Sequence, residues 1–248
     1  MIFLGDTHGN NSHIMYMIKT NKKIQNQQII HVGDFGVGFN KPNQEIKNLQ
    51  HLNKFLKERN VILHVFRGNH DDPAYFSGSH IYSNLKLHKD YTVLEIEGKR
   101  ILGIGGAVSI DRTSRWEYEN SWWSLEKFFL DVEKLEEVRD IDILVTHTTP
   151  SEMLPIVDGL NFPPIVMRFA NVDMGLLDDL VFERNQLSEM LEILLKNNKI
   201  TNHFYGHFHR HLELERDGCK HICLDISEFY ELVDYTDYEK ELNEKYGS

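Results

Sequence analysis

The sequence has few of the features that mark secreted or membrane proteins. Among its 248 residues, Cys219 and Cys223 are the only cysteines, which excludes a disulfide framework. Both lie in an expected hairpin, where one disulfide is conceivable but two buried or free thiols fit better. The chain also lacks an apolar run of ~18 residues and a signal-peptide pattern, so no membrane span is expected. A soluble cytoplasmic protein is therefore predicted.

The chain is also short of positive charge. It has 27 Lys and Arg against 38 Asp and Glu, giving a formal net charge of -11. This balance counts against duplex nucleic acid as a partner, because a polyanion would meet net repulsion. A phosphorylated substrate stays compatible, since bound divalent cations reverse the charge locally. With 41% hydrophobic residues, the chain can bury the core of one large domain.

Strands and helices alternate in the first third of the sequence. Apolar runs and helical spacing predict strands at 2–4, 28–32 and 61–66, with helices at 13–19 and 42–59. Short connections between them imply parallel strands with right-handed crossovers. In such sheets, the loops at the carboxyl ends of the strands usually hold the functional site.

Hairpins and longer connections follow. The expected elements are strands at 91–96, 100–105, 141–146 and 203–205, helices at 125–138 and 185–197, and a final hairpin of 211–216 and 220–224. Residues 155–180 are expected to form a long loop or lid. Together these elements predict one domain over residues 1–227, followed by an acidic tail, 228–248, that is solvated or loosely docked.

Side chains that bind metals follow the expected strands. Asp6 and His8, two apart after the first strand, project to one face of an extended backbone. A lone strand-end Asp or His is usually a cap or a surface residue, but five strand ends with such residues exceed chance. The full set is Asp6, His8, Asp34, Asn69, His70, His147, His207 and His209.

Carboxylates and imidazoles without a thiolate suit first-row divalent ions and argue against a structural zinc cage. Mn²⁺ is the expected metal, with Fe, Zn, Ni or Mg as alternatives. The set suffices for two ions if one carboxylate bridges them. Two ions roughly 3.5–4 Å apart can clamp a phosphate and activate a bridging water for in-line attack.

Five blocks resemble the ordered motifs of the calcineurin-like metallophosphoesterase superfamily: Gly5-Asp6-Thr7-His8-Gly9, Gly33-Asp34, Gly68-Asn69-His70-Asp71, Thr146-His147 and Gly206-His207-Phe208-His209. The resemblance implies an α/β fold, a four-layer α/β/β/α sandwich with a dinuclear centre between two sheets. It implies one metal held by Asp6, His8, Asp34 and His209. The other would be held by Asp34, Asn69, His147 and His207, with Asp34 bridging. His70 would face the substrate as a general acid or a stabiliser of charge.

The second block departs from that of the superfamily's protein Ser/Thr phosphatases. Those enzymes continue it to Gly-Asp-X-X-Asp-Arg-Gly, whereas residues 33–39 here lack both the second Asp and the Arg. This counts against protein Ser/Thr phosphatase specificity. It also leaves His70 in need of another orienting partner, for which a backbone carbonyl is one candidate. Arg67, just before the third block, is expected to form a structural ion pair behind the site.

Residues 105–116 are the other informative stretch. Arg112 or Arg115 could replace the missing arginine, because a guanidinium pairs two phosphate oxygens. The alternative for Arg112, weighted evenly, is a local ion pair with Asp111. Trp116, Trp122 and Trp123 would either wall the substrate pocket or pack the loop. Two weaker substrate-binding candidates lie in the expected lid, Arg168 and Asn171.

The sequence thus predicts a dinuclear-metal-dependent phosphoesterase that hydrolyses a phosphomonoester or a small phosphodiester. Its catalytic residues would be Asp34, Asn69 and His70, with a metal-bridging water as nucleophile. The substrate could be a small molecule, a nucleotide or a phosphoprotein. One alternative is an idle interaction module on the same fold, which retention of every ligand residue argues against. Another is a nuclease, which the negative charge opposes. The sequence does not decide the oligomeric state.

Overall fold

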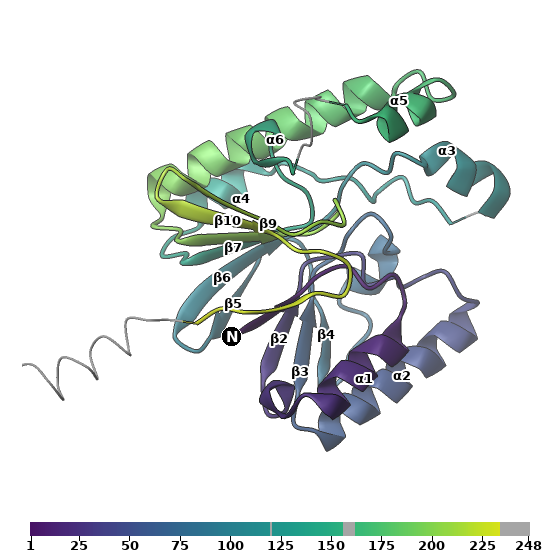
Figure 1. Ribbon diagram of the computed structural model, residues 1–248, viewed down its shortest axis with the longest axis vertical. Coiled ribbons are helices and arrows are strands. Elements are labelled where there is room, and N and C mark those ends of the chain that lie inside the picture. Colours follow the sequence, from purple (N-terminus) through teal and green to yellow (C-terminus); the bar gives the residue numbers. More distant parts are fainter. Residues whose placement is uncertain (120, 156–161, 234–248) are drawn as a thin grey trace, which may run out of the picture.

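The computed structural model describes residues 1–119, 121–155 and 162–233, and in these ranges two β-sheets lie face to face between helices (Figure 1). Helices α1 (Asn11–Thr20) and α2 (Pro42–Glu58) cover the outer face of the first sheet. Helices α4 (Val132–Glu137) and α6 (Leu176–Asn197) cover the second. The expected four-layer α/β/β/α sandwich is confirmed.

The first sheet has the order β11-β1-β2-β3-β4 within the described ranges. Four of its strands are parallel: β1 (Ile2–Leu4), β2 (Gln28–His31), β3 (Ile62–Val65) and β4 (Leu85–Leu87). The alternation of strand and helix predicts this arrangement, because a helical crossover returns the chain to the same end of the sheet. The edge strand β11 (Phe229–Glu231) pairs antiparallel with β1.

The second sheet has the order β5-β6-β7-β8-β10-β9 in the same ranges. Its strands are β5 (Thr92–Ile96), β6 (Lys99–Ile104), β7 (Ile143–Thr146), β8 (Asn202–Tyr205), β9 (Leu212–Arg216) and β10 (Cys219–Cys223). Strands β6, β7, β8 and β10 run parallel, and β5 and β9 close the sheet as antiparallel hairpin partners. Strands β7 and β8 therefore deliver their following loops to one edge.

Short helical turns occupy several connections: η1 (Lys22–Ile24), η2 (Pro73–Phe76), α3 (Arg112–Ser114), η3 (Arg115–Glu119), η4 (Ser151–Met153) and the longer α5 (Pro164–Ala170). No helix in the described part of the chain is long and apolar enough to cross a membrane. Cys219 and Cys223 are buried and free, as expected from their number.

Apolar side chains fill the spaces between these layers. Between the sheets, the rings of Phe3 and Phe204 stack with centroids 3.6 Å apart. Under the helices, side chains at helical spacing are buried, for example Leu49, Leu52 and Leu56 on α2. This packing holds the carboxyl ends of β1, β2, β3, β7 and β8 in register with one another.

Two of the expected elements are wrong in extent. The expected helix at 125–138 is reduced to α4, because the Arg67 guanidinium takes the carbonyl groups of residues 125–127. A helix would need those carbonyls for its own hydrogen bonds. The expected loop at 155–180 contains α5 and the first turns of α6, although 156–161 lie outside the described residues. Asp178 and Asp179 in the first turn favour that earlier helix start.

The expected tail also contains a strand. It was placed at 228–248, yet β11 lies within it and adds to the edge of the first sheet. The backbone N–H of Leu232 donates to the carbonyl of Met1 at 2.9 Å, which ties the segment down further. Residues 234–248 lie outside the described part of the chain.

Candidate dinuclear metal centre

The five ligand-bearing loops meet at one edge of the sandwich. Four of the residues that they present have left-handed backbone conformations: His8, with φ 46°, Asp34, with φ 54°, His207, with φ 68°, and His209, with φ 51°. Such φ values are uncommon for residues other than glycine and carry a cost in backbone energy. In the described ranges, four of the eleven non-glycine residues with such φ values are thus candidate metal ligands.

The first group of ligands comes from three loops. Asp6, His8, Asp34 and His209 each offer one atom, and these atoms all lie within 4.8 Å of one another. Nε2 of His209 lies 3.3 Å from Oδ2 of Asp6 and 2.9 Å from Nε2 of His8. One cation could therefore contact all four side chains.

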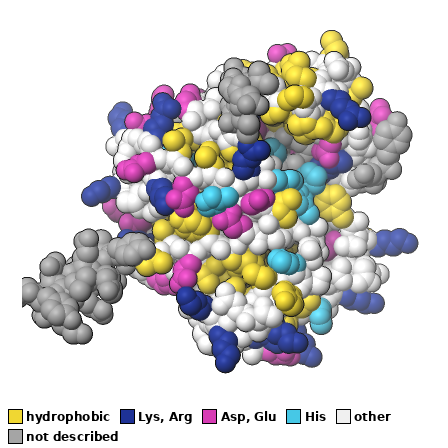
Figure 2. Space-filling model, in the orientation of Figure 1, with side chains coloured by type: hydrophobic (Ala, Val, Ile, Leu, Met, Phe, Trp, Pro, Cys, Tyr) yellow, Lys and Arg dark blue, Asp and Glu magenta, His cyan; other side chains and the backbone are white. Residues whose placement is uncertain are grey.

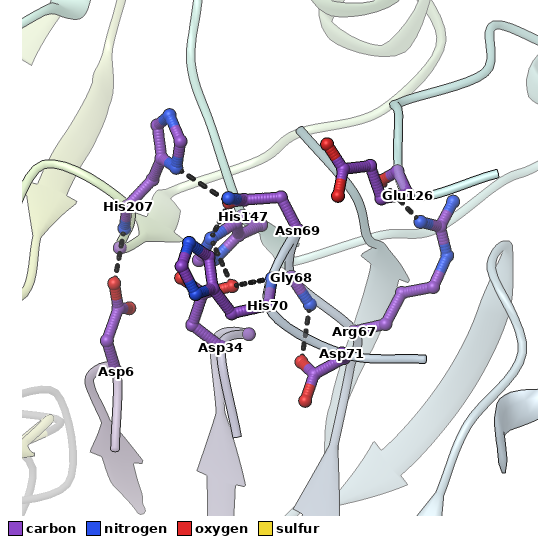
Figure 3. A network of polar contacts seen from close by, with 12 residues as sticks. Asp6, Asp34, Arg67, Gly68, Asn69, His70, Asp71, Glu126, His147 and His207 are labelled. Carbon is purple, nitrogen blue, oxygen red and sulfur yellow. Dashed lines mark hydrogen bonds and ion pairs between the residues drawn. The ribbon is translucent and has the colours of Figure 1, made fainter. Parts of the chain in front are cut away.

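The second group shares Asp34 with the first. Asp34, His147 and His207 again place one atom each within 4.8 Å of the others. Oδ1 of Asn69 lies 3.1 Å from Nε2 of His147 and 2.9 Å from Nδ1 of His207, so the amide belongs to the same group (Figure 3). All seven ligand residues predicted from the sequence are thus brought together.

Several details fit a pair of cations at these positions. Oδ1 of Asp6 is buried and has no hydrogen-bond partner among the described residues, as expected for an atom that awaits a metal. A Cβ atom on Gly206 would overlap that same oxygen, and one on Gly68 would overlap Oδ1 of Asp34. The absence of a side chain at these two glycines therefore leaves room for the carboxylates of Asp6 and Asp34. The donor set of carboxylate, imidazole and amide suits first-row divalent ions.

The protonation states of the ligands depend on burial and on their contacts. Burial alone would raise the pKa of Asp34, but its contacts with His147 hold that pKa well below the usual value. Burial lowers the pKa of His207, which keeps this imidazole neutral. Burial also lowers the pKa of His147, but the charge and hydrogen bond of Asp34, together with the charge of Asp6 and the Val32 carbonyl, outweigh burial and raise the value to about 9. A metal ion would compete with this proton for the imidazole.

A buried carboxylate that the sequence analysis assigned no role holds two of the loops. Asp71 is fully buried, and its Oδ1 accepts hydrogen bonds from the N–H groups of Gly36 and Val37, at 2.7 and 3.1 Å. Its Oδ2 accepts from the N–H of Gly68 at 2.7 Å. Burial, with the nearby charge of Asp34, raises the pKa of Asp71 to about 6. The sequence contains a signal for this role, because Asp71 directly follows the Asn69-His70 pair.

His70 lies beside both groups of ligands. Its backbone N–H donates to Oδ1 of Asp34 at 2.7 Å, and its side chain is 26% exposed. Its Nε2 lies 4.0 Å from Oδ1 of Asp111, so the polar group beside the ring is a carboxylate and not the suggested backbone carbonyl. The ring also stacks on Phe39, with centroids 6.0 Å apart. The sequence suggests Asp111 only as an ion-pair partner of Arg112.

The two candidate arginines have different surroundings. Arg115 is buried, and its Nη1 lies 3.3 Å from a carboxylate oxygen of Glu126 and 3.8 Å from one of Asp111. Arg112 instead pairs with Asp173, at 2.5 Å, and with Asp179 at the start of α6. The local ion pair with Asp111, which was the alternative role for Arg112, is replaced by these longer-range ion pairs. Neither guanidinium lines the cavity beside the metal ligands.

The aromatic and basic residues behind the site are structural. The indole of Trp122 donates to Glu126 at 2.9 Å, and Trp123 packs edge-on against Phe39. Arg67 pairs with Asp90 at 2.7 Å and points away from the ligands, which confirms its expected structural ion pair (Figure 3). The remaining candidates lie outside the cavity lining: Trp116, Trp122, Trp123, Arg168 and Asn171.

A cavity of about 460 Å³ opens beside the ligands. Asp34, Asn69, His70, His207 and His209 form one side of it. The opposite side comes from α5, α6 and the segments before them. Figure 2 shows apolar side chains gathered over the region of α5, with histidine side chains below them.

Several solved structures are similar to this chain. A dimetal phosphatase from Danio rerio is 13% identical, with a TM-score of 0.53 over 91% of this chain and 87% of that one. A candidate 5′-nucleotidase from Staphylococcus aureus, in complex with α-ketoglutarate, is 16% identical with a TM-score of 0.46. The match covers 91% of this chain but 48% of that protein, so the chain spans about half its length. Phosphopantetheinyl hydrolase from Mycobacterium tuberculosis is 13% identical with a TM-score of 0.41, covering 90% and 89%.

No curated protein matches the sequence. The family model for calcineurin-like phosphoesterases, however, matches residues 1–211, which contain every ligand of the two groups. The match covers most of the chain and agrees with the sandwich fold and the shared carboxylate. The family implies a dinuclear metal centre. The chain therefore belongs to the calcineurin-like phosphoesterase family and is a hydrolase of phosphate esters.

Proposed function

We propose that this protein hydrolyses a phosphomonoester or a small phosphodiester at the edge of the sandwich where the two ligand groups meet. The observation that carries the proposal is the position of Asp34, which belongs to both groups. A carboxylate shared in this way can hold two cations close together. The cavity beside it provides room for the ester.

Two divalent ions, when bound, supply a clamp for phosphate oxygens and an activated water. Asp6, His8, Asp34 and His209 would hold one ion, and Asn69, His147 and His207 would join Asp34 at the other. Neutral imidazole and amide ligands add no negative charge. The loaded site would therefore stay attractive to a phosphate in a chain that is acidic overall.

His70 is proposed to act on the leaving group. Its ring reaches the cavity, lies against His8 with centroids 5.1 Å apart, and has Asp111 on its other side at 4.0 Å. From there the imidazole can donate a proton to the leaving oxygen or stabilise the charge that develops on it. Asp111 orients the ring in place of the missing acidic residue of the second block.

Mn²⁺ is the metal we propose, with Fe, Zn, Ni and Mg as alternatives. The ligands comprise nitrogen and oxygen donors without a thiolate, and this mixture suits the middle of the first transition row. Cys223 has its Sγ directed to the carbonyl of Gly206 at 3.6 Å and belongs to neither group.

The test uses protein stripped of metal and reloaded with one divalent ion at a time. Turnover of p-nitrophenyl phosphate or its bis ester is expected, highest with Mn²⁺. His70→Ala should lose most of this activity while it still binds two ions, as measured by metal analysis. His51→Ala, at an exposed position on α2, is the matched control and should keep both properties. No turnover with any divalent ion would refute the proposal.

A further inference from the structure

The cavity beside the metal ligands has two chemically different sides. One side carries the ligands and His70, as described above. The other side is formed by apolar side chains from the loops after β6 and β7 and from helices α5 and α6. We call this side the apolar chamber and define it by Ile110, Leu154, Ile165, Val166, Phe169 and Leu180.

The walls of the chamber are held by a small core of their own. Val166 and Leu180 are buried together with Val108 and Leu176, and Ile110 and Phe169 pack against this group. These contacts support four of the six chamber residues, Ile110, Val166, Phe169 and Leu180. An apolar surface beside a charged site costs free energy if it only faces water.

We propose that the ester group of the substrate is uncharged and apolar, an aryl group or an alkyl chain, and that it binds in the apolar chamber. This inference rests on the proposed function, because the phosphate must lie against the ligand side of the cavity. An ester bound there has its organic group directed away from the ligands. In this cavity the surface away from the ligands is the apolar chamber.

The cavity lining also includes four polar residues: Asp111, Thr148, Glu183 and Arg184. Oε2 of Glu183 already accepts a hydrogen bond from the N–H of Val108 at 2.6 Å. Burial raises the pKa of Glu183 to about 8, so this carboxyl is largely uncharged at neutral pH. The guanidinium of Arg184 lies over the ring of Phe162, 4.9 Å from its centroid. Apolar residues still outnumber polar ones in the lining away from the metal ligands, so an apolar group fits this surface better than one with further charges.

The total volume agrees with a group of moderate size. A cavity of about 460 Å³ is within the range of roughly 300–1,000 Å³ seen for small-molecule pockets. A folded peptide segment or an intact phosphoprotein surface would not enter it. The chamber therefore favours a small ester over a macromolecular one.

A series of n-alkylphosphonates from methyl to octyl tests the inference by binding alone. These compounds keep one head group, cannot be hydrolysed at phosphorus, and differ only in apolar length. Calorimetry with the Mn²⁺-loaded protein should show affinity rising about fourfold per methylene until the chamber is full, which corresponds to about 0.8 kcal/mol per buried CH₂. An affinity that does not change with chain length, or that falls, would overturn the inference.

A pair of variants on α5 locates the effect. Ile165 lines the cavity and is 50% exposed, whereas Met167 on the same helix is 44% exposed and lies outside the lining. Ile165→Asp should lower the affinity for octylphosphonate at least tenfold, and Met167→Asp should leave this affinity unchanged. Methylphosphonate should bind equally to both variants, which shows that the metal site is intact. An unchanged octyl affinity in Ile165→Asp would overturn the assignment of the chamber.

Turnover of p-nitrophenyl phosphate separates this inference from the proposed function. Turnover together with a flat phosphonate series refutes the chamber and leaves the phosphoesterase in place. Length-dependent binding without turnover of any ester supports the chamber and refutes the proposed function. A loaded protein that binds none of the phosphonates overturns the inference as well.

Discussion

Nη2 of Arg115 donates a hydrogen bond to the backbone carbonyl of Asn69 at 3.2 Å, from the side away from the metal ligands. Nη1 of the same guanidinium donates to Oγ of Ser109 at 2.5 Å, and that oxygen also accepts from the Asn69 side-chain amide at 2.8 Å. The buried guanidinium of Arg115 thus holds the backbone carbonyl of Asn69 directly and its side-chain amide through Ser109. Its Oδ1 is left to face His147 and His207, and we propose that Arg115 positions Asn69 and does not grip phosphate.

This relationship makes Ser109→Ala informative. Loss of the hydroxyl leaves the buried amide of Asn69 without its acceptor, so its oxygen is no longer aimed at the second metal position. Loss of such an outer partner typically costs 10–100-fold in metal affinity. We expect one of two Mn²⁺ sites to weaken by about this factor, measured by calorimetry on metal-stripped protein. Ser188→Ala, whose hydroxyl donates to the Arg184 carbonyl on α6, should bind both ions normally. Unchanged affinity in both variants contradicts the positioning role.

Asp111→Asn tests how His70 is oriented. The substitution keeps the size of the side chain but removes the charge beside Nε2 of His70. If His70 protonates the leaving oxygen, its misorientation matters most for esters with poor leaving groups. We expect kcat for phenyl phosphate to fall about tenfold more than kcat for p-nitrophenyl phosphate, in this variant and in His70→Ala. Equal losses on both esters would exclude the proton-donor role. Metal content is measured alongside, because Asp111 also lies 3.8 Å from Arg115.

The metal ligands could be predicted from the sequence because each stands just after a buried strand. The end of a strand fixes where the next residue lies, and parallel strands bring their ends to one edge. The positions of Asp34 and His147 follow from this rule. Asp111 and Ser109 could not be predicted in the same way, because they lie in an irregular segment without periodicity. Ser109 meets Asn69 across 40 positions of sequence, and spacing does not encode such a contact.

The sequence also could not decide which of Arg112 and Arg115 would bind phosphate. The two side chains have the same chemistry and lie three positions apart, and their partners decide their roles. Asp179 belongs to the part of α6 that the sequence analysis placed in a loop, so its pairing with Arg112 could not be foreseen. The shortened helix α4 has a similar origin. Its missing first turns depend on Arg67, which is distant in sequence.

Arg112→Gln distinguishes a structural arginine from one that binds substrate. The guanidinium joins α3 to Asp173 and Asp179, and Lys127 also reaches Asp179 at 3.0 Å. Charge-assisted hydrogen bonds of this kind contribute about 2 kcal/mol, so urea unfolding should show a loss of that order. KM for p-nitrophenyl phosphate should stay within about twofold, because the pair already saturates the guanidinium. A rise of tenfold or more in KM would show that Arg112 binds the substrate.

His64 and His88 should make the protein sensitive to acid. Their rings share a hydrogen bond of 2.9 Å, and burial lowers the pKa of His64 to about 3 and that of His88 to about 4. Both folded values lie below the unfolded value of about 6.5. Their stabilising contribution is therefore complete above pH 6.5 and is lost as the pH falls towards 4. Each proton taken up on unfolding lowers the free energy of unfolding by about 1.4 kcal/mol per pH unit.

His88→Gln checks this origin of the acid sensitivity. Glutamine keeps an N–H that can donate to Nδ1 of His64 but does not titrate. Between pH 6 and pH 4.5, the slope of unfolding free energy against pH should fall by about 1.4 kcal/mol per unit relative to the wild type. His51→Gln, exposed on α2, should leave the slope as it is. Identical slopes in all three proteins would show that the pair does not control acid stability.

Gly206→Ala tests whether Asp6 is a metal ligand. A Cβ at this position would overlap Oδ1 of Asp6 and meet Cγ2 of Val32 at 3.0 Å, so the carboxylate has to move. The same carboxylate accepts the N–H of His207 at 2.9 Å, which ties the displacement to both groups of ligands. In the wild type, Mn²⁺ at 100 times its Kd should stabilise the fold by about 2.7 kcal/mol and raise the Tm accordingly. The variant should lose most of that Mn²⁺-dependent rise.

Gly175→Ala is the matched control for this substitution. A Cβ there meets nothing closer than 3.7 Å, so the full metal-dependent rise in Tm should persist. Comparing the two variants in the presence and absence of Mn²⁺ separates a displaced ligand from a general loss of stability, which would lower both Tm values equally. If Gly206→Ala keeps the whole Mn²⁺-dependent rise, Asp6 cannot be a ligand. The first group would then be reduced to His8, Asp34 and His209.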